Sequence, residues 1–347
     1  MPKAVALYSG GLDSTLAVIA MMKQGVEVTA ITFMNHFGCD ISDRSSCSKD
    51  PFAASLKFGF KVKLAHLSGK FLNIIINPKY GHGKNMNPCV DCRILMLREA
   101  QEFMDMTGAD FLITGEVLGQ RPMSQRRDCF PRIDREAGVS GLVVRPLSGK
   151  LLPVTIPEEK GLISRKLMYD INGRTRKPQM SLAEEWGLTE YPAPAGGCLL
   201  TEPNYSHRLR DLLEHSKDPG YREINFLRVG RHFRFSSRCK IVVGRNKSEN
   251  SAIRSLAGHD DVILDVEGYG SPTTVVLGEG TDEALALAAS ICARYSDAKH
   301  LPRVTVAVWQ GVDKHHVIAE PASDAVINAF RIEKKRHREE VLNSQPA

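Results

Sequence analysis

The first residues constrain the fold more than any other segment. AVALY, Ala4 to Tyr8, is an apolar run that indicates a buried strand, and SGGLDS, Ser9 to Ser14, follows it directly. A helical pattern begins near Asp13. A buried strand that turns through glycines into a helix is the opening unit of a parallel α/β sheet. Such a turn also directs backbone N–H groups and the helix dipole at one point, which favours a bound anion.

The same alternation continues downstream. Apolar runs at Val26 to Phe33, Phe60 to Leu67 and Ala109 to Gly115 predict further strands. A helical pattern runs from Cys89 to Thr107, and Gly108 is placed to end it as a C-cap. Strands that alternate with helices favour a doubly wound parallel sheet with helices on both faces.

The pattern changes in the second half of the 347-residue chain. From about 147, prolines break the sequence into short pieces, and a helix follows through Tyr205 to His215. KDPGY, 217–221, is typical of a linker, and short strand-like runs with one strong helix, 280–296, come after it. We therefore expect a first domain at 1–216, a C-terminal α+β domain at 222–332 and a charged tail at 333–347.

Composition excludes few classes of protein. The chain is 42% hydrophobic and carries a formal charge of +6, which permits an anionic partner without requiring one. No apolar run approaches the ~18 residues that span a membrane. The N-terminus has no basic segment or cleavage site of a signal peptide, so we expect a cytoplasmic protein without membrane contact.

The opening loop suits a diphosphate. Gly10 and Gly11 allow close approach of the backbone, Ser9 and Ser14 add hydroxyl donors, and Asp13 would help hold Mg²⁺ on the phosphates. The loop lacks the GK[ST] ending that serves γ-phosphate transfer. A plain glycine turn capped by Asp13 or Ser14 is the simpler alternative.

SGGLDS resembles the PP-loop of the ATP pyrophosphatases. That resemblance implies cleavage of ATP between the α and β phosphates and adenylation of a substrate oxygen, with the loop holding the departing pyrophosphate. The nucleotide-binding residues that we expect are Ser9, Gly10, Gly11, Asp13, Ser14 and, after the strand at Ala109 to Gly115, Gly115. The loop sequence alone does not indicate which of the many members of this family the chain resembles.

Three of the eight cysteines carry a second signal. NPCVDC places Cys89 and Cys92 at a helix start, a position that lowers thiol pKa, and Cys198 lies in PAGGC. A structural zinc site would need a fourth ligand, such as His82 or Asp91. A thiol pair that passes a persulfide, or an iron–sulfur cluster with one open iron, are the alternatives. Cys39 and Cys47 are accessory thiols at most.

The combination resembles the iron–sulfur-dependent tRNA thiouridine synthases, over about Lys3 to His215. GKNMNPCVDC, ITGEVLGQRPMSQRRD and PAGGCLLT carry the resemblance. It implies that Cys89, Cys92 and Cys198 ligate a [4Fe–4S] cluster whose free iron binds hydrosulfide, and that they act in catalysis with Asp13. The chain departs from some relatives at Met96, where they carry a lysine.

Two arginine-rich loops suit phosphate groups, because guanidinium binds phosphate in a bidentate manner. A solvated charged face is the simpler alternative, and some of these residues would serve ATP. The candidate RNA contacts in these loops are Arg121, Arg126, Arg127, Arg174, Arg176 and Lys177.

The C-terminal part resembles the RNA-binding domain of NFACT-type proteins. KIVVGRNKSEN, DVILDVEGYGSPTTVVL and DEALALAASICARYSDAK carry this resemblance. It implies RNA contacts at Arg245, Asn246 and Lys247, in a stretch made basic by Arg228, Arg231, Arg234, Arg238 and Lys240. A small docking domain without RNA contact is the alternative.

Together these features predict ATP-dependent thiolation of a tRNA uridine. The expected partners are tRNA, a sulfide or persulfide donor and a second copy of the chain in a homodimer. Another adenylating PP-loop enzyme that acts on a small molecule, and a non-catalytic RNA-binding protein, are the alternatives.

Overall fold

The computed structural model describes residues 1–37, 52–192 and 198–333. Cys39, Cys47, most of PAGGC and nearly all of the expected tail lie outside the described residues. The chain divides into two compact units, Met1–Thr201 and Glu202–Ala347.

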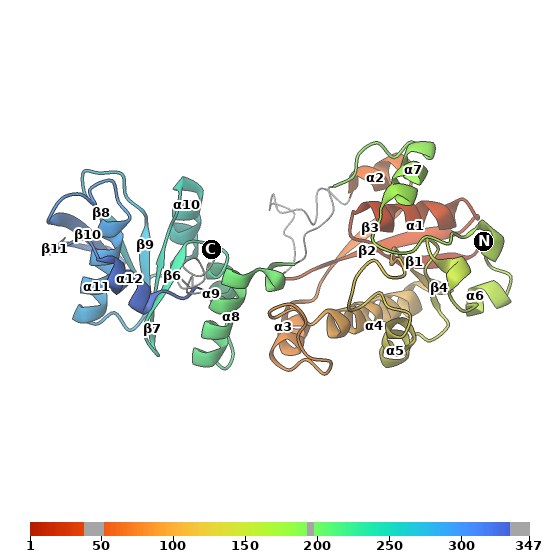
Figure 1. Cartoon of the computed structure of the whole chain (residues 1–347), viewed down its shortest axis with the longest axis horizontal. Helices are drawn as coiled ribbons and strands as arrows, with labels where there is room; N and C mark the ends of the chain where they lie inside the picture. Colours follow the sequence, from red (N-terminus) through yellow and green to blue (C-terminus); the bar gives the residue numbers. More distant parts are fainter. Residues whose placement is uncertain (38–51, 193–197, 334–347) are drawn as a thin grey trace, which may run out of the picture. The chain divides into compact units, whose positions relative to one another are not determined.

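The N-terminal unit is built on a five-stranded sheet in the order β3-β2-β1-β4-β5, and every pair of neighbours is parallel. The strands are β1 (Lys3–Leu7), β2 (Glu27–Met34), β3 (Lys61–His66), β4 (Phe111–Thr114) and β5 (Val143–Val144). Figure 1 shows α1 (Leu12–Met22), α2 (Phe52–Phe58) and α7 (Lys177–Glu185) on one face of this sheet, and α3 (Ser68–Ile76), α4 (Cys89–Thr107) and α5 (Cys129–Ala137) on the other. The predicted doubly wound sheet is confirmed.

The sequence explains why the sheet is covered on both faces. Residues 4–7 of β1 and all of β4 are buried, as expected of central parallel strands. Helix α4 begins at Cys89 and ends at Thr107, and Gly108 adopts the left-handed conformation at its C-cap, as predicted. The chain reverses its strand order between β1 and β4, so their carboxyl ends flank the crevice in which open α/β sheets bind ligands.

The proline-rich part after 147 forms short elements at the border of this sheet. They are η1 (Gly149–Leu151), α6 (Ile156–Glu159), η2 (Arg165–Leu167), α7 and η3 (Leu199–Thr201). The loop before α7 runs beside the loop after β4, because Leu118 and Asn172 form a β-bridge and Gly173 N donates to Leu118 O at 2.7 Å. The two arginine-rich loops of the sequence therefore lie side by side.

The C-terminal unit has a six-stranded antiparallel sheet in the order β11-β10-β8-β9-β7-β6. Helix α11 (Asp282–Arg294) packs its buried alanines, Ile291 and Cys292 on one face, and Thr281 caps it by accepting from Ala284 N. The strands are β6 (Arg231–Ser236), β7 (Cys239–Val243), β8 (Val262–Val266), β9 (Thr274–Gly278), β10 (Val304–Gln310) and β11 (Asp313–Ala319). The helices are α8 (Pro203–His215), α9 (Tyr221–Phe226), α10 (Lys247–Leu256), α11 (Asp282–Arg294) and α12 (Asp324–Phe330).

The boundary between the units differs from the expected one at 216. It lies between Thr201 and Glu202, so α8 is in the C-terminal unit. Asp211 of α8 explains the difference, because it pairs with Arg234 of β6 at 2.6 Å and with Lys240 of β7 at 3.2 Å. These ion pairs tie α8 to the antiparallel sheet.

In the described parts of the chain, no helix combines the length and the apolar character that crossing a bilayer requires.

Candidate functional site

The loop Ser9–Ser14 forms the expected turn at the carboxyl end of β1. Gly10 has φ of 70°, a region that favours glycine. Ser14 Oγ donates to Gly11 O at 3.0 Å and lies 3.2 Å from Ser9 Oγ, so both hydroxyls hold the turn together. Gly11 is the N-cap of α1 and provides no side-chain cap. The first-turn amides of α1 therefore have no side-chain acceptor at the N-cap, which leaves them available to an anion.

Gly115 explains how the next loop approaches this turn. A Cβ at Gly115 would lie 2.5 Å from Ser14 N and 2.6 Å from Asp13 C. The end of β4 thus packs directly against the backbone of the phosphate-binding turn, and only glycine permits that separation. Nucleotide contact by Gly115 itself stays a prediction.

Asp13 lies in a polar cluster at the start of α1. Gln120 Nε2 donates to Asp13 Oδ2 at 3.1 Å, while Oδ1 is buried without a hydrogen-bond partner among the described residues. Burial raises the pKa of Asp13, and Gln120, Arg176 and Arg121 oppose that effect without cancelling it. A buried carboxylate oxygen without a partner fits a hard cation such as Mg²⁺.

Helix α7 contributes two residues to this cluster. Gln179 is fully buried, and neither atom of its amide has a partner among the described residues. Arg176 Nε, at the N-cap of α7, is also buried without a partner. Gln120 and Gln179 were not predicted from the sequence, since glutamines in loops and on short helices carry no motif.

The structure brings the three predicted cysteines into one neighbourhood. Cys89 begins α4 and Cys92 follows in its first turn. The loop before α4 is fixed to the segment after Cys198, because Met86 N donates to Leu200 O at 3.1 Å and Asn85 Nδ2 donates to Thr201 O at 2.8 Å. All three are free thiols.

The expectation of a lowered thiol pKa at the helix start is wrong. Burial raises the pKa of Cys89, Cys92 and Cys198, and for Cys92 it reaches about 12. The neighbouring thiols raise the pKa of Cys92 further, whereas Arg93 lowers it. Desolvation outweighs the helix dipole here, so the three thiols are protonated at neutral pH in this structure.

As placed, these thiols do not form a metal site. Among the described residues, no three His, Cys, Asp or Glu side chains gather closely enough to hold a metal ion. The two suggested fourth zinc ligands are engaged elsewhere. Asp91 accepts from the backbone N–H groups of Lys79 and Tyr80 at 3.0 and 3.1 Å, and His82 Nε2 lies 2.8 Å from Ile75 O.

A buried ion network joins the cysteine helix to the end of β4. Arg93 follows Cys92, and its Nε lies 3.0 Å from Glu116 Oε1, although the angle does not satisfy a hydrogen bond. Arg145 Nε donates to Glu116 Oε2 at 3.0 Å and binds Asp134 with its other nitrogens at 2.7 and 2.9 Å. Burial opposes ionisation of Glu116, but the two arginines prevail and lower its pKa. Glu116 was not predicted from the sequence.

Arg121 lies near both the phosphate-binding turn and the predicted cysteines. It lies in the loop after β4, and it is close enough to lower the pKa of both Asp13 and Cys89. The phosphate-binding turn and the thiols are therefore within electrostatic reach of the same guanidinium group.

The remaining basic candidates differ in their surroundings. Arg126 pairs with Asp128 at 3.0 Å on the surface. The other exposed basic residues of the two arginine-rich loops are Arg121, Arg127, Arg174 and Lys177. Their contact with RNA stays a prediction.

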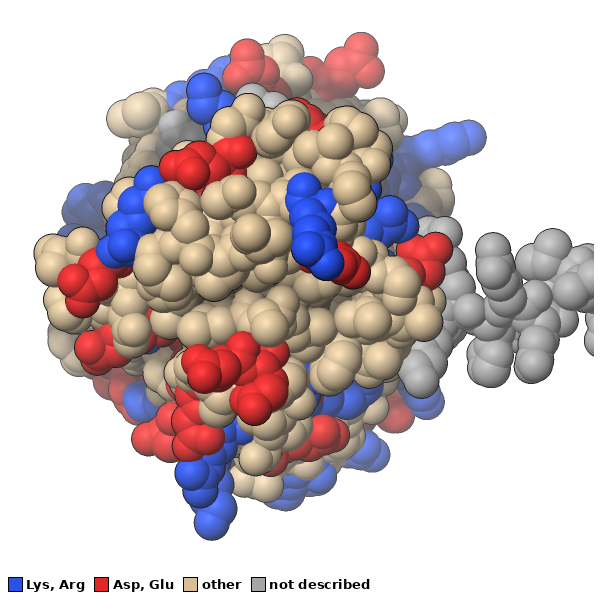
Figure 2. All heavy atoms as spheres, turned by 90° about the vertical axis from the view of Figure 1, so that its left-hand side faces the viewer, with Lys and Arg blue, Asp and Glu red and all other residues tan. Residues whose placement is uncertain are grey.

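Part of the basic character of the C-terminal unit is internal. Lys240 is buried, and desolvation lowers its pKa to about 8 in spite of Asp211. Arg245 is bound by Glu249 through its backbone N–H and guanidinium, and Asn246 caps α10, whereas Lys247 is exposed. On the face that Figure 2 displays, acidic and basic groups are interspersed over a largely uncharged surface.

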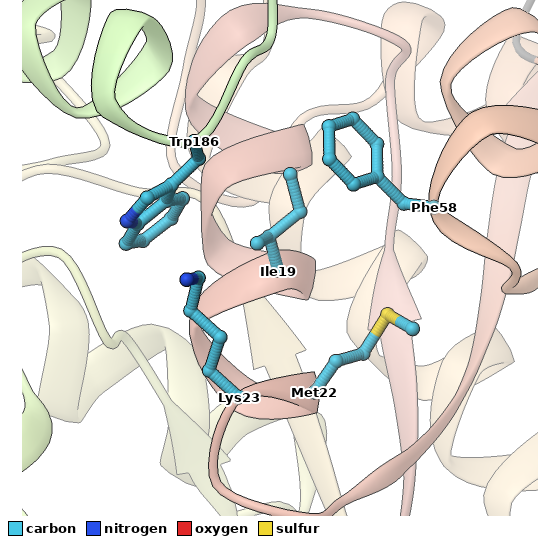
Figure 3. Close-up of a pocket in the computed structure, with 5 residues that line it drawn as sticks. All are labelled: Ile19, Met22, Lys23, Phe58 and Trp186. Carbon is cyan, nitrogen blue, oxygen red and sulfur yellow. The ribbon is translucent and has the colours of Figure 1, made fainter.

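An apolar pocket of about 320 Å³ lies elsewhere, along the second half of α1. Figure 3 shows Ile19, Met22, Phe58 and Trp186 around it, with the amino group of Lys23 directed at the Trp186 ring. The phosphate-binding turn is at the opposite end of α1, so this pocket is not part of the site.

Comparisons with known families agree with both resemblances. Residues 1–150 match the family model "Thiamine biosynthesis protein (ThiI)", and residues 230–331 match "NFACT protein RNA binding domain". These matches confirm the PP-loop resemblance of the first segment and the NFACT resemblance of the second.

Curated relatives resemble the chain over part of their length. It is 31% identical to a probable tRNA sulfurtransferase of Lysinibacillus sphaericus, over 46% of this chain and 38% of that protein. It is 32% identical to the bifunctional protein NifU/MnmA of Rubrobacter xylanophilus, over 62% of this chain and 42% of that protein. A solved 4-thiouridine synthetase–RNA complex with bound ATP is 28% identical over 43% of this chain and 37% of that chain, with a TM-score of 0.34. The chain spans about two fifths of the length of these relatives.

Proposed function

We propose that this protein is an ATP-dependent tRNA sulfurtransferase that converts a uridine to a thiouridine in the cytoplasm. The observation that supports it best is the position of Arg121, which acts on the pKa of both Asp13 and Cys89. A phosphate-binding turn and a set of thiols that share one guanidinium group suit a reaction in which adenylation and sulfur transfer occur on the same base. The names of the curated relatives support the same reaction.

The first chemical step is adenylation. The uridine, extruded from its stack, presents a carbonyl oxygen that attacks the α-phosphorus of ATP, and pyrophosphate leaves. The amides of residues 9–14 stabilise the departing charge, and Asp13 Oδ1 is the atom that would hold Mg²⁺. Arg121 and Arg176 complement the phosphates, so these two residues, predicted as RNA contacts, are assigned to the nucleotide instead.

The second step replaces oxygen by sulfur. A sulfur nucleophile forms a bond to the activated carbon, the C–O bond breaks, and AMP leaves with the oxygen. Hydrosulfide loses its proton and needs no electrons. A cysteine persulfide needs a second thiol to attack its S–S bond, which leaves a disulfide for an external reductant. Cys89, Cys92 and Cys198 are the thiols available for either route.

The [4Fe–4S] cluster and zinc are separate questions. The thiols as placed among the described residues do not form a ligand set, so neither step is assigned to a cluster. Cluster ligation stays a prediction, as do the sulfide or persulfide donor and the homodimer. Analysis of iron and acid-labile sulfide in protein purified without oxygen tests cluster ligation, and analytical sedimentation tests the homodimer.

The decisive experiment compares modified nucleosides of bulk tRNA from a deletion strain and its parent by mass spectrometry. We expect the loss of one thiolated uridine, restored by the wild-type gene and not by Asp13→Asn or Cys198→Ser. Asp170→Asn, at an exposed carboxylate outside the cluster, is the matched control and restores the nucleoside. A complete set of thiouridines in the deletion strain contradicts the proposal.

Purified protein separates the two steps. Asp13→Asn should lower tRNA-dependent pyrophosphate release at least 100-fold, while Cys198→Ser should keep that release and lose thiolation. Equal loss of pyrophosphate release in both variants would contradict the assignment of Asp13 to adenylation and Cys198 to sulfur transfer.

A further inference from the structure

Gln179 is the side chain whose surroundings are least explained by the fold. It lies in the first turn of α7 and is 0% exposed, yet neither its amide oxygen nor its amide nitrogen has a hydrogen-bond partner among the described residues. Buried polar atoms are nearly always paired, so an unpaired amide in the interior indicates a missing ligand, ion or water. The Gln179 amide also contacts the Asp13 carboxyl group and lowers its pKa, although the geometry of that contact does not satisfy a hydrogen bond.

The unpaired atoms around Asp13 complement one another. Asp13 Oδ1 and the Gln179 amide oxygen are acceptors, while Arg176 Nε and the Gln179 amide nitrogen are donors. Gln120 already occupies the other oxygen of Asp13 at 3.1 Å, so that contact fixes the carboxylate and leaves Oδ1 for another partner. A phosphate group with a divalent cation satisfies both acceptors and donors together, because the cation takes oxygen ligands and the phosphate takes N–H groups.

We propose that Gln179 completes the polyphosphate site from α7. Its amide nitrogen, beside Arg176, donates to the polyphosphate, and its amide oxygen joins Asp13 Oδ1 as an oxygen ligand for the divalent cation. This inference rests on the proposed function, since it assigns Gln179 to the nucleotide of that reaction. Gln179 is thus a binding residue for the nucleotide and its cation, supplied by an element outside the phosphate-binding turn.

A purely structural role predicts a different behaviour. If the amide were needed for the fold, its replacement by leucine would destabilise the free protein. If the amide waits for a ligand, leucine removes two unsatisfied buried atoms at similar volume, which leaves the free protein as stable as before or more stable. The melting temperature without nucleotide therefore separates the two roles, and it does not depend on activity.

The test uses the full-length protein and α,β-methylene-ATP, which cannot be cleaved between its α and β phosphates. Binding is measured by calorimetry across a range of Mg²⁺ concentrations for wild type and Gln179→Leu. Gln101→Leu, the same change on the opposite face of the sheet, is the matched control. We expect Gln179→Leu to bind at least 10-fold more weakly with an unchanged or higher melting temperature, and Gln101→Leu to stay within twofold of wild type.

Gln179→Glu gives a second, independent readout. The glutamate keeps an oxygen and replaces the N–H donor by a negative charge. We therefore expect the Mg²⁺ concentration at half-saturation to be at least threefold lower, and the nucleotide to bind more weakly when no Mg²⁺ is added. Wild-type affinity in Gln179→Leu, or a Mg²⁺ dependence unchanged in Gln179→Glu, overturns the inference while the proposed function stands. A lower melting temperature of free Gln179→Leu also overturns it, and a wild-type protein that does not bind the nucleotide overturns both.

Discussion

Replacing Gly115 by alanine tests the packing that supports the phosphate-binding turn. The added Cβ would lie 2.5 Å from Ser14 N, whereas ordinary contacts begin at 3.4 Å, so the backbone must retreat by about 0.9 Å. The clash is with backbone atoms, which cannot rotate away as a side chain can. Overpacking of this kind costs about 1–3 kcal/mol, or roughly 2–12 °C in melting temperature for a domain of this size.

The functional loss should exceed the loss of stability. A displacement of that size moves the amides of residues 13 and 14 away from a phosphate, and a hydrogen bond to a charged group is worth about 1.5–3 kcal/mol. Since 1.4 kcal/mol is a factor of 10, Gly115→Ala should weaken α,β-methylene-ATP binding by about 10- to 100-fold.

The matched control is Gly69→Ala. Gly69 lies in α3, and a Cβ there meets nothing within 4 Å. Alanine in place of a helical glycine should be neutral or stabilising by about 0.5–1 kcal/mol. Scanning fluorimetry and calorimetry on both variants measure the two effects. Wild-type melting temperature and affinity in Gly115→Ala would refute the argument that β4 sets the shape of the turn.

Three further predictions concern buried ionisable groups. Glu116→Leu leaves Arg93 and Arg145 without their shared partner and should lower the free energy of unfolding by about 3–5 kcal/mol in urea titrations, and a loss below 1 kcal/mol would contradict the network. Burial lowers the pKa of His232 well below its ordinary value, so its contribution to the stability of the C-terminal unit is complete above about pH 6.5 and is lost as the pH falls below that value. His232→Gln should therefore make the free energy of unfolding less dependent on pH between about pH 5 and 6.5. The thiol of Cys92, with a pKa of about 12, should react with iodoacetamide far more slowly at pH 7.5 than a free cysteine does, as mass spectrometry of the labelled peptide would show.

The local parts of the fold were predictable from the sequence because their signals are local. The apolar run before SGGLDS, the helical spacing from Cys89 to Thr107 and Gly108 after it each reflect contacts within a few residues. The expected strands and helices accordingly recur with bounds shifted by at most two residues.

The parts that failed depend on contacts between distant segments. The thiol pKa was expected to fall because a helix start is visible in the sequence, whereas the burial that raises it is not. Lys240 and Arg234 add to the basic count of the sequence, but both are held by Asp211 of a helix assigned to the other domain. The role of Gln179 depends on the packing of α7 near the phosphate-binding turn. The role of Glu116 depends on the packing of the end of β4 near the cysteine helix α4.

The placement of the arginines bears on how one site could serve two anions. Arg121 and Arg176 act on the pKa of Asp13, and their loops are joined by the hydrogen bond from Gly173 N to Leu118 O. Arg121 is exposed, as are Arg127, Arg174 and Lys177 of the same loops. The two arginines that act on Asp13 thus suit the nucleotide, while the other basic residues of these loops remain for the RNA backbone. The salt dependence of binding therefore distinguishes these residues from Arg121 and Arg176. Replacing Arg127, Arg174 or Lys177 should reduce the salt dependence of RNA binding by about one counterion per charge and leave nucleotide affinity unchanged.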